Sequence, residues 1–270
     1  MKCAALQMVS SHDVSDNLAA ARRLVDQAAR QGAELVVLPE YFCLLGQRDT
    51  DKLAVQETLG EGPIQVALAD MARASGVWLI GGTLPVATGD DAQRVFNTTL
   101  AFDPQGQPIG RYDKIHLFRF ARGSESYDES RVLRAGRQPQ VLTVTDRAGR
   151  DWRVGLSICY DLRFPELYRH AQADIWVVPS AFTFTTGAAH WEVLLRARAI
   201  ENQAYVIAAA QGGQHSNGRQ TWGQSMVIDP WGDILAQHAQ GEAVVLATLD
   251  AARLAEVRSQ LPALTHRVMS

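Results

Sequence analysis

The chain has 270 residues, of which 47% are hydrophobic and 20% are charged, and its formal net charge is −3. This composition is typical of a soluble globular protein and argues against nucleic acid or an anionic membrane as partner, because no stretch is rich in Lys and Arg. The longest apolar runs are about ten residues, which is too short to span a bilayer.

The cysteines and histidines narrow the chemistry further. The three cysteines, at positions 3, 43 and 159, are an odd number, which argues against a disulfide framework and for a reducing compartment. We therefore expect a cytoplasmic protein. No Cys/His pair has the spacing of zinc ligands, and neither a G-x-G-x-x-G sequence nor a P-loop is present, so we expect no metal and no cofactor.

Strand and helix patterns alternate from the N-terminus. We predict a strand over residues 2–8, a helix over 14–31 that Gly32 ends, a strand over 35–38, a helix over 63–74 that Gly76 ends, and a strand over 77–81. The region 112–135 is long, polar and charged, which is uncommon in a compact domain unless the loop is functional.

The two halves of the chain resemble each other. Residues 33–40 (AELVVLPE) resemble 173–180 (ADIWVVPS), and the Asp-Pro-x-Gly sequences at 103–106 and 229–232 are typical of hairpin turns. The strand-like sequence and the Asp-Pro-x-Gly turn are farther apart in the first half than in the second, so the first half carries an insertion. Their common order predicts an α/β fold built from a duplicated βαβ-type unit, a four-layer α-β-β-α sandwich. No linker divides it, and we expect a single domain over residues 1–270.

Cys159 is the most informative residue. It follows an apolar run that is typical of a short buried strand, and Pro165 then opens a short helix. The thiol is therefore predicted at the carboxyl end of a strand, where α/β proteins hold reactive side chains out of the core. A lone cysteine in an apolar run is more often a small core residue, so other residues must decide between the two interpretations.

Two charged residues complete a chemical hypothesis. Glu40 directly follows a predicted strand that ends in Pro39, and Lys114 lies beside an apolar run. A thiol attacks a carbonyl carbon as the thiolate, so Cys159 needs a base, and Glu40 fits that role. The Lys114 ammonium and a backbone N–H near Tyr160 would stabilise the tetrahedral oxyanion.

Two further residues have open interpretations. Glu129, in the polar region, is either a second carboxylate that positions Lys114 or the substrate amide, or a solvated loop acid. Cys43 follows Glu40 by three residues, and we expect it near the rim of a pocket.

The motifs around these residues resemble those of one family. The sequences 39–42 (PEYF), 112–118 (YDKIHLF) and 159–166 (CYDLRFPE) resemble the Glu, Lys and Cys motifs of the nitrilase superfamily of carbon–nitrogen hydrolases. The motifs occur in the right order, and the resemblance covers essentially the whole chain. It implies the same four-layer sandwich, a Glu-Lys-Cys catalytic triad and hydrolysis of linear amides through a thioester intermediate.

Other stretches narrow the resemblance to one branch. Residues 179–182, 189–203 and 208–211 resemble the Nit-type branch, and most of all its deaminated glutathione amidases. Arg119 departs from the pattern, because relatives usually have Asp there. The departure leaves open how Arg119 and residues 119–135 affect substrate choice.

The resemblance also implies substrate-binding roles for Arg163, Phe182 and Thr183. Arg163 is similar in position to a residue that binds the substrate carboxylate in carbamoyl-hydrolysing relatives, and bidentate guanidinium geometry suits that role. The alternative is a structural pair of Arg163 with Asp161 or Glu166.

The implied activity is that of an amidase acting on a small carboxylate-bearing amide, with deaminated glutathione hydrolysed to 2-oxoglutarate and Cys-Gly. The alternatives are an ω-amidase acting on 2-oxoglutaramate or 2-oxosuccinamate, and an N-carbamoyl amino acid hydrolase. A protein of a different class, which binds without catalysis, would not need a thiol, a carboxylate and an ammonium together.

The helix predicted over 189–203 indicates self-association. It has two apolar stripes, one with Val193 and Ile200 and the other with Trp191 and Leu195. One stripe can cover a sheet, but an outer helix face should not be apolar. We therefore expect a homodimer or a larger homo-oligomer, as the resemblance also implies. The tail, residues 260–270, is expected at that interface or, alternatively, folded back over the stripe within one chain.

Overall fold

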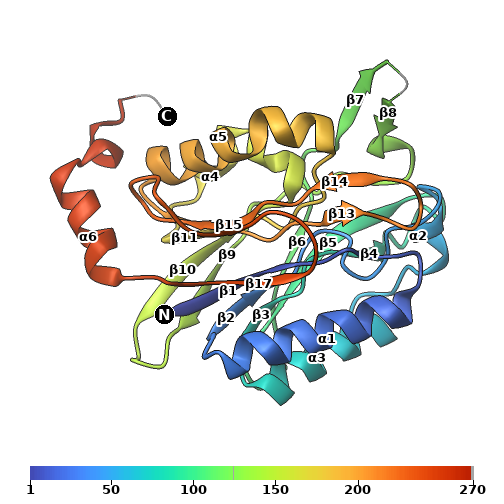
Figure 1. Ribbon diagram of the computed structural model, residues 1–270, viewed down its shortest axis with the longest axis horizontal. Coiled ribbons are helices and arrows are strands. Elements are labelled where there is room, and N and C mark those ends of the chain that lie inside the picture. Colours follow the sequence, from blue (N-terminus) through green and yellow to red (C-terminus); the bar gives the residue numbers. More distant parts are fainter. Residues whose placement is uncertain (124, 269–270) are drawn as a thin grey trace.

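The computed structural model describes residues 1–123 and 125–268. Two sheets lie face to face, and helices cover the outer face of each, so that Figure 1 shows four layers. The seven strands of the first sheet are β1 (Lys2–Gln7), β2 (Leu35–Val37), β3 (Trp78–Ile80), β4 (Leu84–Ala87), β5 (Val95–Phe102), β6 (Pro108–Asp113) and β17 (Ala243–Thr248). The six strands of the second sheet are β9 (Val141–Thr145), β10 (Asp151–Leu156), β11 (Ile175–Val177), β12 (Tyr205–Ala208), β15 (Ser225–Ile228) and β16 (Ile234–His238).

Two helices cover each sheet. The first sheet carries α1 (Val14–Arg30) and α3 (Pro63–Ser75), and the second carries α4 (Pro165–His170) and α5 (Phe184–Asn202). This arrangement confirms the predicted α-β-β-α sandwich. The helix ends follow the sequence signals, since Gly76 closes α3 in the left-handed conformation, at a φ of 62°, which glycine adopts without steric penalty.

Both faces of the first sheet are buried, and β1 shows why its sequence is apolar throughout. The side chains of Cys3 and Ala5 join the core between the two sheets, while those of Ala4 and Leu6 join the core beneath α1 and α3. Because successive side chains of a strand point to opposite faces, a continuous apolar run is the pattern that suits a sheet covered on both sides.

The strand order repeats between the sheets. The first sheet has three parallel neighbours, β1, β2 and β3, followed by two antiparallel strands, β5 and β6. The second sheet has the same order, with β10, β11 and β12 as the parallel strands and β15 and β16 as the antiparallel ones. Both Asp-Pro-x-Gly sequences form the connecting turns. The Gly106 N–H donates to the Asp103 carbonyl over 2.9 Å, and the Gly232 N–H donates to the Asp229 carbonyl over 3.0 Å. The structure therefore contains the predicted internal repeat.

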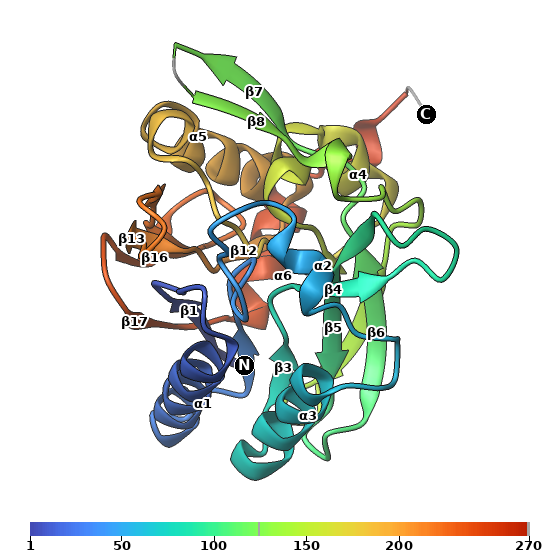
Figure 2. The same ribbon diagram turned by 90° about the vertical axis from the view of Figure 1, so that its right-hand side faces the viewer.

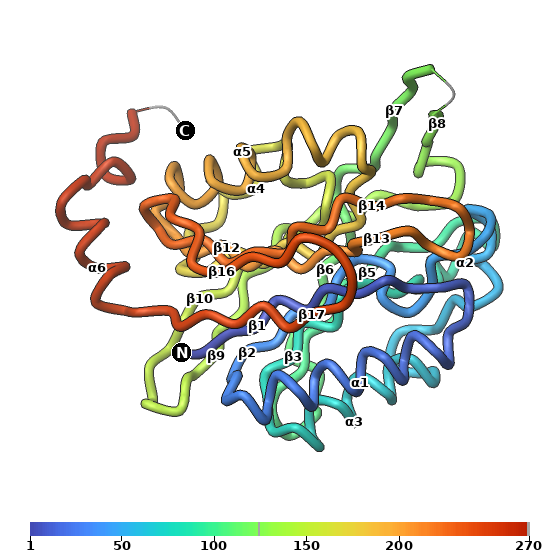
Figure 3. The backbone as a smooth tube through the Cα atoms, viewed as in Figure 1, coloured from blue at the N-terminus to red at the C-terminus, as the bar shows by residue number. Residues whose placement is uncertain are grey.

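Each half also carries segments outside the repeat. The insertion predicted in the first half lies before α3, where it includes α2 (Asp51–Ala54), and β4 adds a further strand. The second half has an addition that the spacing did not indicate, the hairpin of β13 (Gly212–Gln214) and β14 (Gln220–Trp222). Figure 3 shows this hairpin reaching the α2 region, where Asn217 Nδ2 donates to the Gly46 carbonyl over 2.7 Å.

Two local predictions are wrong. The helix expected to begin at 189 begins at Phe184, because the Thr183 side chain caps it by accepting from the Thr186 N–H. The region 112–135, expected as a loop, contains a hairpin of β7 (Arg119–Arg122) and β8 (Glu125–Asp128) that projects from the body in Figure 2, followed by the 3₁₀ turn η1 (Glu129–Arg131). The many charged residues there obscure the strand pattern.

The C-terminal segment packs away from the outer stripe of α5. After α6 (Ala251–Gln260) and the 3₁₀ turn η3 (Ala263–His266), Arg267 donates to the Arg169 carbonyl over 3.3 Å. Val193 and Ile200 stay 69% and 47% exposed. The alternative in which the tail covers this stripe is therefore wrong for residues 260–268, and 269–270 lie outside the described residues. Within the described part of the chain, no helix is both long and apolar enough to cross a membrane.

Candidate active site

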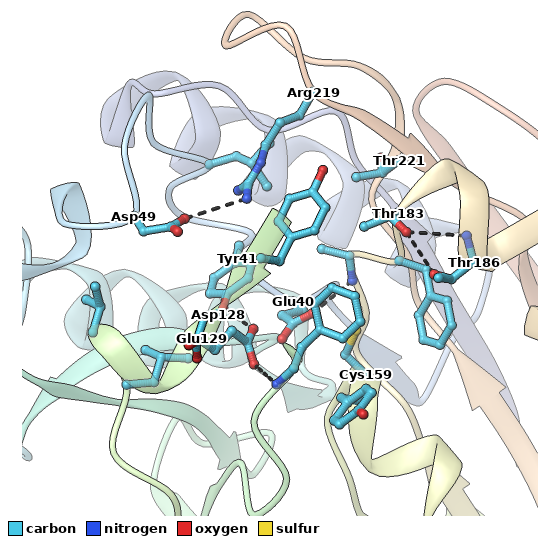
Figure 4. Close-up of a pocket in the computed structure, with 18 of the residues that line it drawn as sticks. Glu40, Tyr41, Asp49, Asp128, Glu129, Cys159, Thr183, Thr186, Arg219 and Thr221 are labelled. Carbon is cyan, nitrogen blue, oxygen red and sulfur yellow. Dashed lines mark hydrogen bonds and ion pairs between the residues drawn. The ribbon is translucent and has the colours of Figure 1, made fainter. Parts of the chain in front are cut away.

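Glu40, Lys114 and Cys159 lie together where three strands end. Figure 4 shows Glu40 and Cys159 close together at one end of a pocket. Glu40 follows β2, Lys114 follows β6, and Cys159 begins the 3₁₀ turn η2 (Cys159–Arg163) after β10. All three side chains are buried. The first two come from one sheet and the third from the other, so the site forms where the two halves of the repeat meet.

Lys114 is held between two carboxylates. Its Nζ lies 2.8 Å from Glu40 Oε1 and 2.8 Å from Glu129 Oε2. Burial lowers the pKa of Lys114, but the negative charges of Glu129 and Glu40 outweigh it and hold the pKa well above its usual value. The ammonium is therefore charged at neutral pH. The structure also decides between the two interpretations of Glu129, which contacts Lys114 directly and is not a solvated loop acid.

The two glutamates are tuned in opposite directions. Burial raises the pKa of Glu40, and the charge of Glu129 adds to this effect although Lys114 opposes it. Burial also acts on Glu129, but Lys114, the Phe118 N–H at 2.7 Å and the Tyr41 hydroxyl at 2.8 Å outweigh it and lower its pKa. Paired groups whose pKa values are pushed apart suit different roles: Glu129 stays an anion, while Glu40 is the better proton acceptor.

The turn at Cys159 is strained and firmly held. Cys159 has a φ of 48°, in the left-handed region that non-glycine residues rarely adopt. The buried Asp161 carboxylate closes the turn, because it accepts from the Ile158 N–H over 2.9 Å and from the Tyr112 hydroxyl over 2.8 Å. Burial and the neighbouring Glu40 raise the pKa of the Cys159 thiol well above its usual value, so the thiol is neutral until a base accepts its proton.

The thiol opens into a pocket that Tyr160, Arg163, Phe182 and Thr183 also line. The Arg163 guanidinium lies 5.7 Å from the centre of the Tyr160 ring and 5.4 Å from that of Phe182. No ion pair of Arg163 with Asp161 or Glu166 is present among residues 1–123 and 125–268. The structural alternative for Arg163 is therefore wrong. Arg163 lines the pocket, and its Nη1 lies 3.3 Å from His190 Nδ1.

Sequence reasoning missed several residues of the site. Asn97 Nδ2 donates to Glu40 Oε1 over 2.9 Å, and the Ala181 N–H donates to the other Glu40 oxygen over 2.9 Å. Tyr41 and Asp161 lie inside the Glu and Cys motifs, where their positions could have suggested a role, but nothing around Asn97 in the sequence does so. The prediction that Cys43 lies near the rim of the pocket is wrong, because its Sγ is buried 3.6 Å from the Thr83 carbonyl and does not line the pocket.

The site shows no sign of a metal centre. Across the part of the chain that the structure describes, no group of three or more His, Cys, Asp or Glu side chains is arranged to hold a metal ion.

Gly82 offers a test of how the strand end supports Glu40. It has a φ of 55°, and a Cβ there would overlap the carbonyl oxygen of Pro39, which precedes Glu40. Gly89 is a matched control, since its φ is 81° but a Cβ would meet no atom within 4 Å. We expect Gly82→Ala to lower the free energy of unfolding by about 2 kcal/mol more than Gly89→Ala, and to lower turnover as well. Equal effects in denaturant titrations would show that backbone conformation alone matters at Gly82.

With this geometry established, comparison with known proteins identifies the class. Residues 2–259 match the family model for carbon–nitrogen hydrolases. The chain therefore belongs to the carbon–nitrogen hydrolase family, within the nitrilase superfamily, and is a hydrolase of carbon–nitrogen bonds.

Individual relatives match over nearly their full length. The chain is 45% identical to the deaminated glutathione amidase of Synechocystis sp., over 98% of this chain and 97% of the relative. It is 36% identical to an ω-amidase of Mus musculus, over 98% and 94% of the two chains. The crystal structure of Nit3 from Saccharomyces cerevisiae, a member of branch 10 of the nitrilase superfamily, has a TM-score of 0.86 at 28% identity and covers 100% of this chain and 97% of its own.

Proposed function

We propose that this enzyme hydrolyses the amide bond of deaminated glutathione to 2-oxoglutarate and Cys-Gly, with Glu40, Lys114 and Cys159 as its catalytic residues. The observation that carries the mechanism is the buried contact of Lys114 Nζ with Glu40, 2.8 Å long, beside the Cys159 thiol. The likeness to deaminated glutathione amidases over the whole chain supports the substrate.

In the first step Glu40 accepts the proton of Cys159, and the thiolate attacks the amide carbon. The raised pKa of both groups suits this transfer, because burial disfavours a free thiolate and makes the Glu40 carboxylate more basic. Lys114 Nζ and the Tyr160 N–H stabilise the oxyanion. Glu40 then donates its proton to the departing amine, and the thioester remains.

In the second step Glu40 accepts a proton from water, and the resulting hydroxide attacks the thioester carbonyl. The oxyanion again lies against Lys114, and its collapse releases 2-oxoglutarate and the Cys159 thiol, which regains a proton from Glu40. Glu129 stays ionised throughout, because Lys114 and the Phe118 N–H stabilise its charge. It acts by positioning Lys114.

The substrate carboxylate nearest the reacting carbon binds Arg163, between Phe182 and Thr183. The Arg163 guanidinium is not paired with an acid among the described residues, and both neighbours line the same pocket. A planar guanidinium can hold a carboxylate through two parallel hydrogen bonds.

A second candidate, ω-amidase activity on 2-oxoglutaramate or 2-oxosuccinamate, is favoured by the match to the ω-amidase of Mus musculus. A substrate panel decides between them. Deaminated glutathione, both ω-amides and an N-carbamoyl amino acid are compared by product release, with Cys159→Ala as the blank. We expect the highest kcat/KM with deaminated glutathione. A higher value with either ω-amide would reverse the assignment.

We also infer the cellular compartment and the domain organisation of the protein. All three cysteines are free and buried, which suits a reducing cytoplasm. The two sheets share one core, to which β1 and β10 both contribute, which supports a single hydrolase domain over residues 1–270.

The outer face of α5 supports a homodimer or a larger homo-oligomer. Val193 and Ile200 are exposed on this face, although apolar side chains are uncommon on an exposed helix face. We expect light scattering at micromolar concentration to give at least the mass of a dimer, and Val193→Glu with Ile200→Glu to give the mass of a monomer. Val66→Glu is the matched control, because Val66 is also exposed but lies on α3. A monomeric wild-type protein with full activity would contradict the inference.

A further inference from the structure

The mouth of the pocket is built from segments that lie outside the internal repeat. Lys52 comes from α2, in the addition to the first half, and Arg219 comes from the β13–β14 hairpin, in the addition to the second half. The two additions are joined by hydrogen bonds from Asn217 Nδ2 to the Leu45 and Gly46 carbonyls, 3.3 and 2.7 Å long. The site at Cys159 belongs to the repeated scaffold, whereas its mouth belongs to these additions.

The mouth carries more positive than negative charge. Lys52 Nζ lies 3.9 Å from Asp49 Oδ1, and Arg219 Nη2 lies 3.6 Å from the same oxygen. Within residues 1–123 and 125–268, neither cation has another carboxylate within 4.0 Å. Two cations therefore share one carboxylate, and they share it at long distances.

Aromatic rings lie against both cations, and the more distant Glu129 and Glu40 only partly offset the charge of Lys52. Lys52 Nζ lies 4.8 Å from the centre of the Tyr41 ring, and the Arg219 guanidinium lies 5.1 Å from that of Tyr127. Asp128, another acid of the pocket wall, lies 3.9 Å from Arg119 Nε and 3.8 Å from Arg131 Nε. Lys52 keeps only 12% of its side chain exposed, so water screens its charge poorly. The same burial lowers the pKa of the Lys52 ammonium, which the charges of Asp49 and Glu129 oppose.

We propose that Lys52 and Arg219, the outer cation pair, bind a second carboxylate of the substrate. This carboxylate belongs to the amine that leaves when the amide bond breaks. The enzyme would thus select amides that carry a carboxylate on each side of the scissile bond. The inference rests on the proposed function, in which the acyl carboxylate occupies Arg163. Figure 4 shows Arg219 and Asp49 at the opposite end of the pocket from Cys159, so a substrate whose amide carbon lies at Cys159 extends its leaving group toward this end.

The outer cation pair should act only before the leaving group departs. Deaminated glutathione and 2-oxoglutaramate form the same thioester with Cys159, but only the first has a carboxylate on its leaving group, at the glycine end. That carboxylate departs with Cys-Gly when the amide bond breaks. The pair should therefore affect binding and thioester formation with deaminated glutathione, and have no contact with the shared thioester.

The experiment measures kcat/KM for both substrates and compares their ratio. We expect Lys52→Met and Arg219→Gln each to lower the ratio of deaminated glutathione to 2-oxoglutaramate about tenfold, since a charge-assisted hydrogen bond is lost. Lys52→Arg should retain most of the ratio. Arg73→Gln is the matched control and should leave the ratio unchanged, because Arg73 is an exposed arginine of α3 that lies outside the pocket.

A substrate analogue makes the assignment specific to the carboxylate. With the glycine carboxylate of deaminated glutathione converted to an amide, kcat/KM of the wild type should fall about tenfold or more. The same change of substrate should hardly alter kcat/KM of the double variant Lys52→Met with Arg219→Gln, which lacks both cations. An unchanged ratio in both single variants, or an equal fall with both forms of the substrate, would overturn the role of the outer cation pair. Failure of the wild type to hydrolyse deaminated glutathione would instead overturn the proposed function itself, and this inference with it.

Discussion

Replacing Cys159 with alanine should lower amide turnover by at least roughly a thousandfold, as expected when an enzyme loses its nucleophile. Cys159 is the one cysteine that lines the pocket within the described residues. Cys3 and Cys43 lie in the core, and burial raises the pKa of each to about 12. Cys3→Ala and Cys43→Ala should therefore keep most of the activity, which is checked by ammonia or amine release under identical conditions.

Alkylation gives an independent test of the same assignment. Iodoacetamide followed by mass spectrometry should label Cys159 before Cys3 and Cys43. Because burial and Glu40 raise the pKa of Cys159, the labelling rate should still be rising above pH 9, the ordinary value for a thiol. Preferential labelling of Cys43, with parallel loss of activity, would remove Cys159 from the mechanism.

Conservative substitutions of Glu40 and Lys114 should each lower kcat by roughly a hundredfold or more. Glu40→Gln keeps the shape of the side chain and removes the base. Lys114→Arg keeps the charge, but a planar guanidinium cannot replace a compact ammonium that lies 2.8 Å from both Glu40 and Glu129. Steady-state kinetics with the preferred substrate of the panel measures both effects.

Folding controls are needed because Glu40 and Lys114 form a buried ion pair. Removing one partner of such a pair leaves the other charge uncompensated, which destabilises a protein. Thermal unfolding should show that each variant is folded at the assay temperature, and Glu61→Gln, at an exposed position before α3, should behave as the wild type. Near wild-type turnover in a folded Glu40 or Lys114 variant would rule that residue out of the mechanism.

Local signals in the sequence determined much of this protein. The apolar runs of β1 and β2, the helix end at Gly76 and the turns at Asp103 and Asp229 were all predictable, because the interactions that specify them join residues only a few positions apart. Their order also predicted the repeat and the two-sheet sandwich. The motifs around Glu40, Lys114 and Cys159 indicated a hydrolase of carbon–nitrogen bonds.

Only the tertiary structure decided how distant side chains meet. Glu129 could have been a solvated acid, and its contact with Lys114 depends on how the segment after the β7–β8 hairpin folds back beside β5, where Leu133 bridges Val95. Asn97 reaches Glu40 because β5 lies near the end of β2 in space. Cys43 is close to Glu40 in sequence and yet faces the core, since chain proximity does not set the direction of a side chain.

The mouth of the pocket is the part of the site that the sequence predicts least. Lys52 and Arg219 lie in different halves of the chain, each in a polar stretch whose sequence has no distinguishing pattern. They share Asp49 because two unrelated additions to the repeat converge over the same end of the sandwich. A charge pattern of this kind is not encoded by local propensity or periodicity, because it arises only when packing of the sheets brings the additions together.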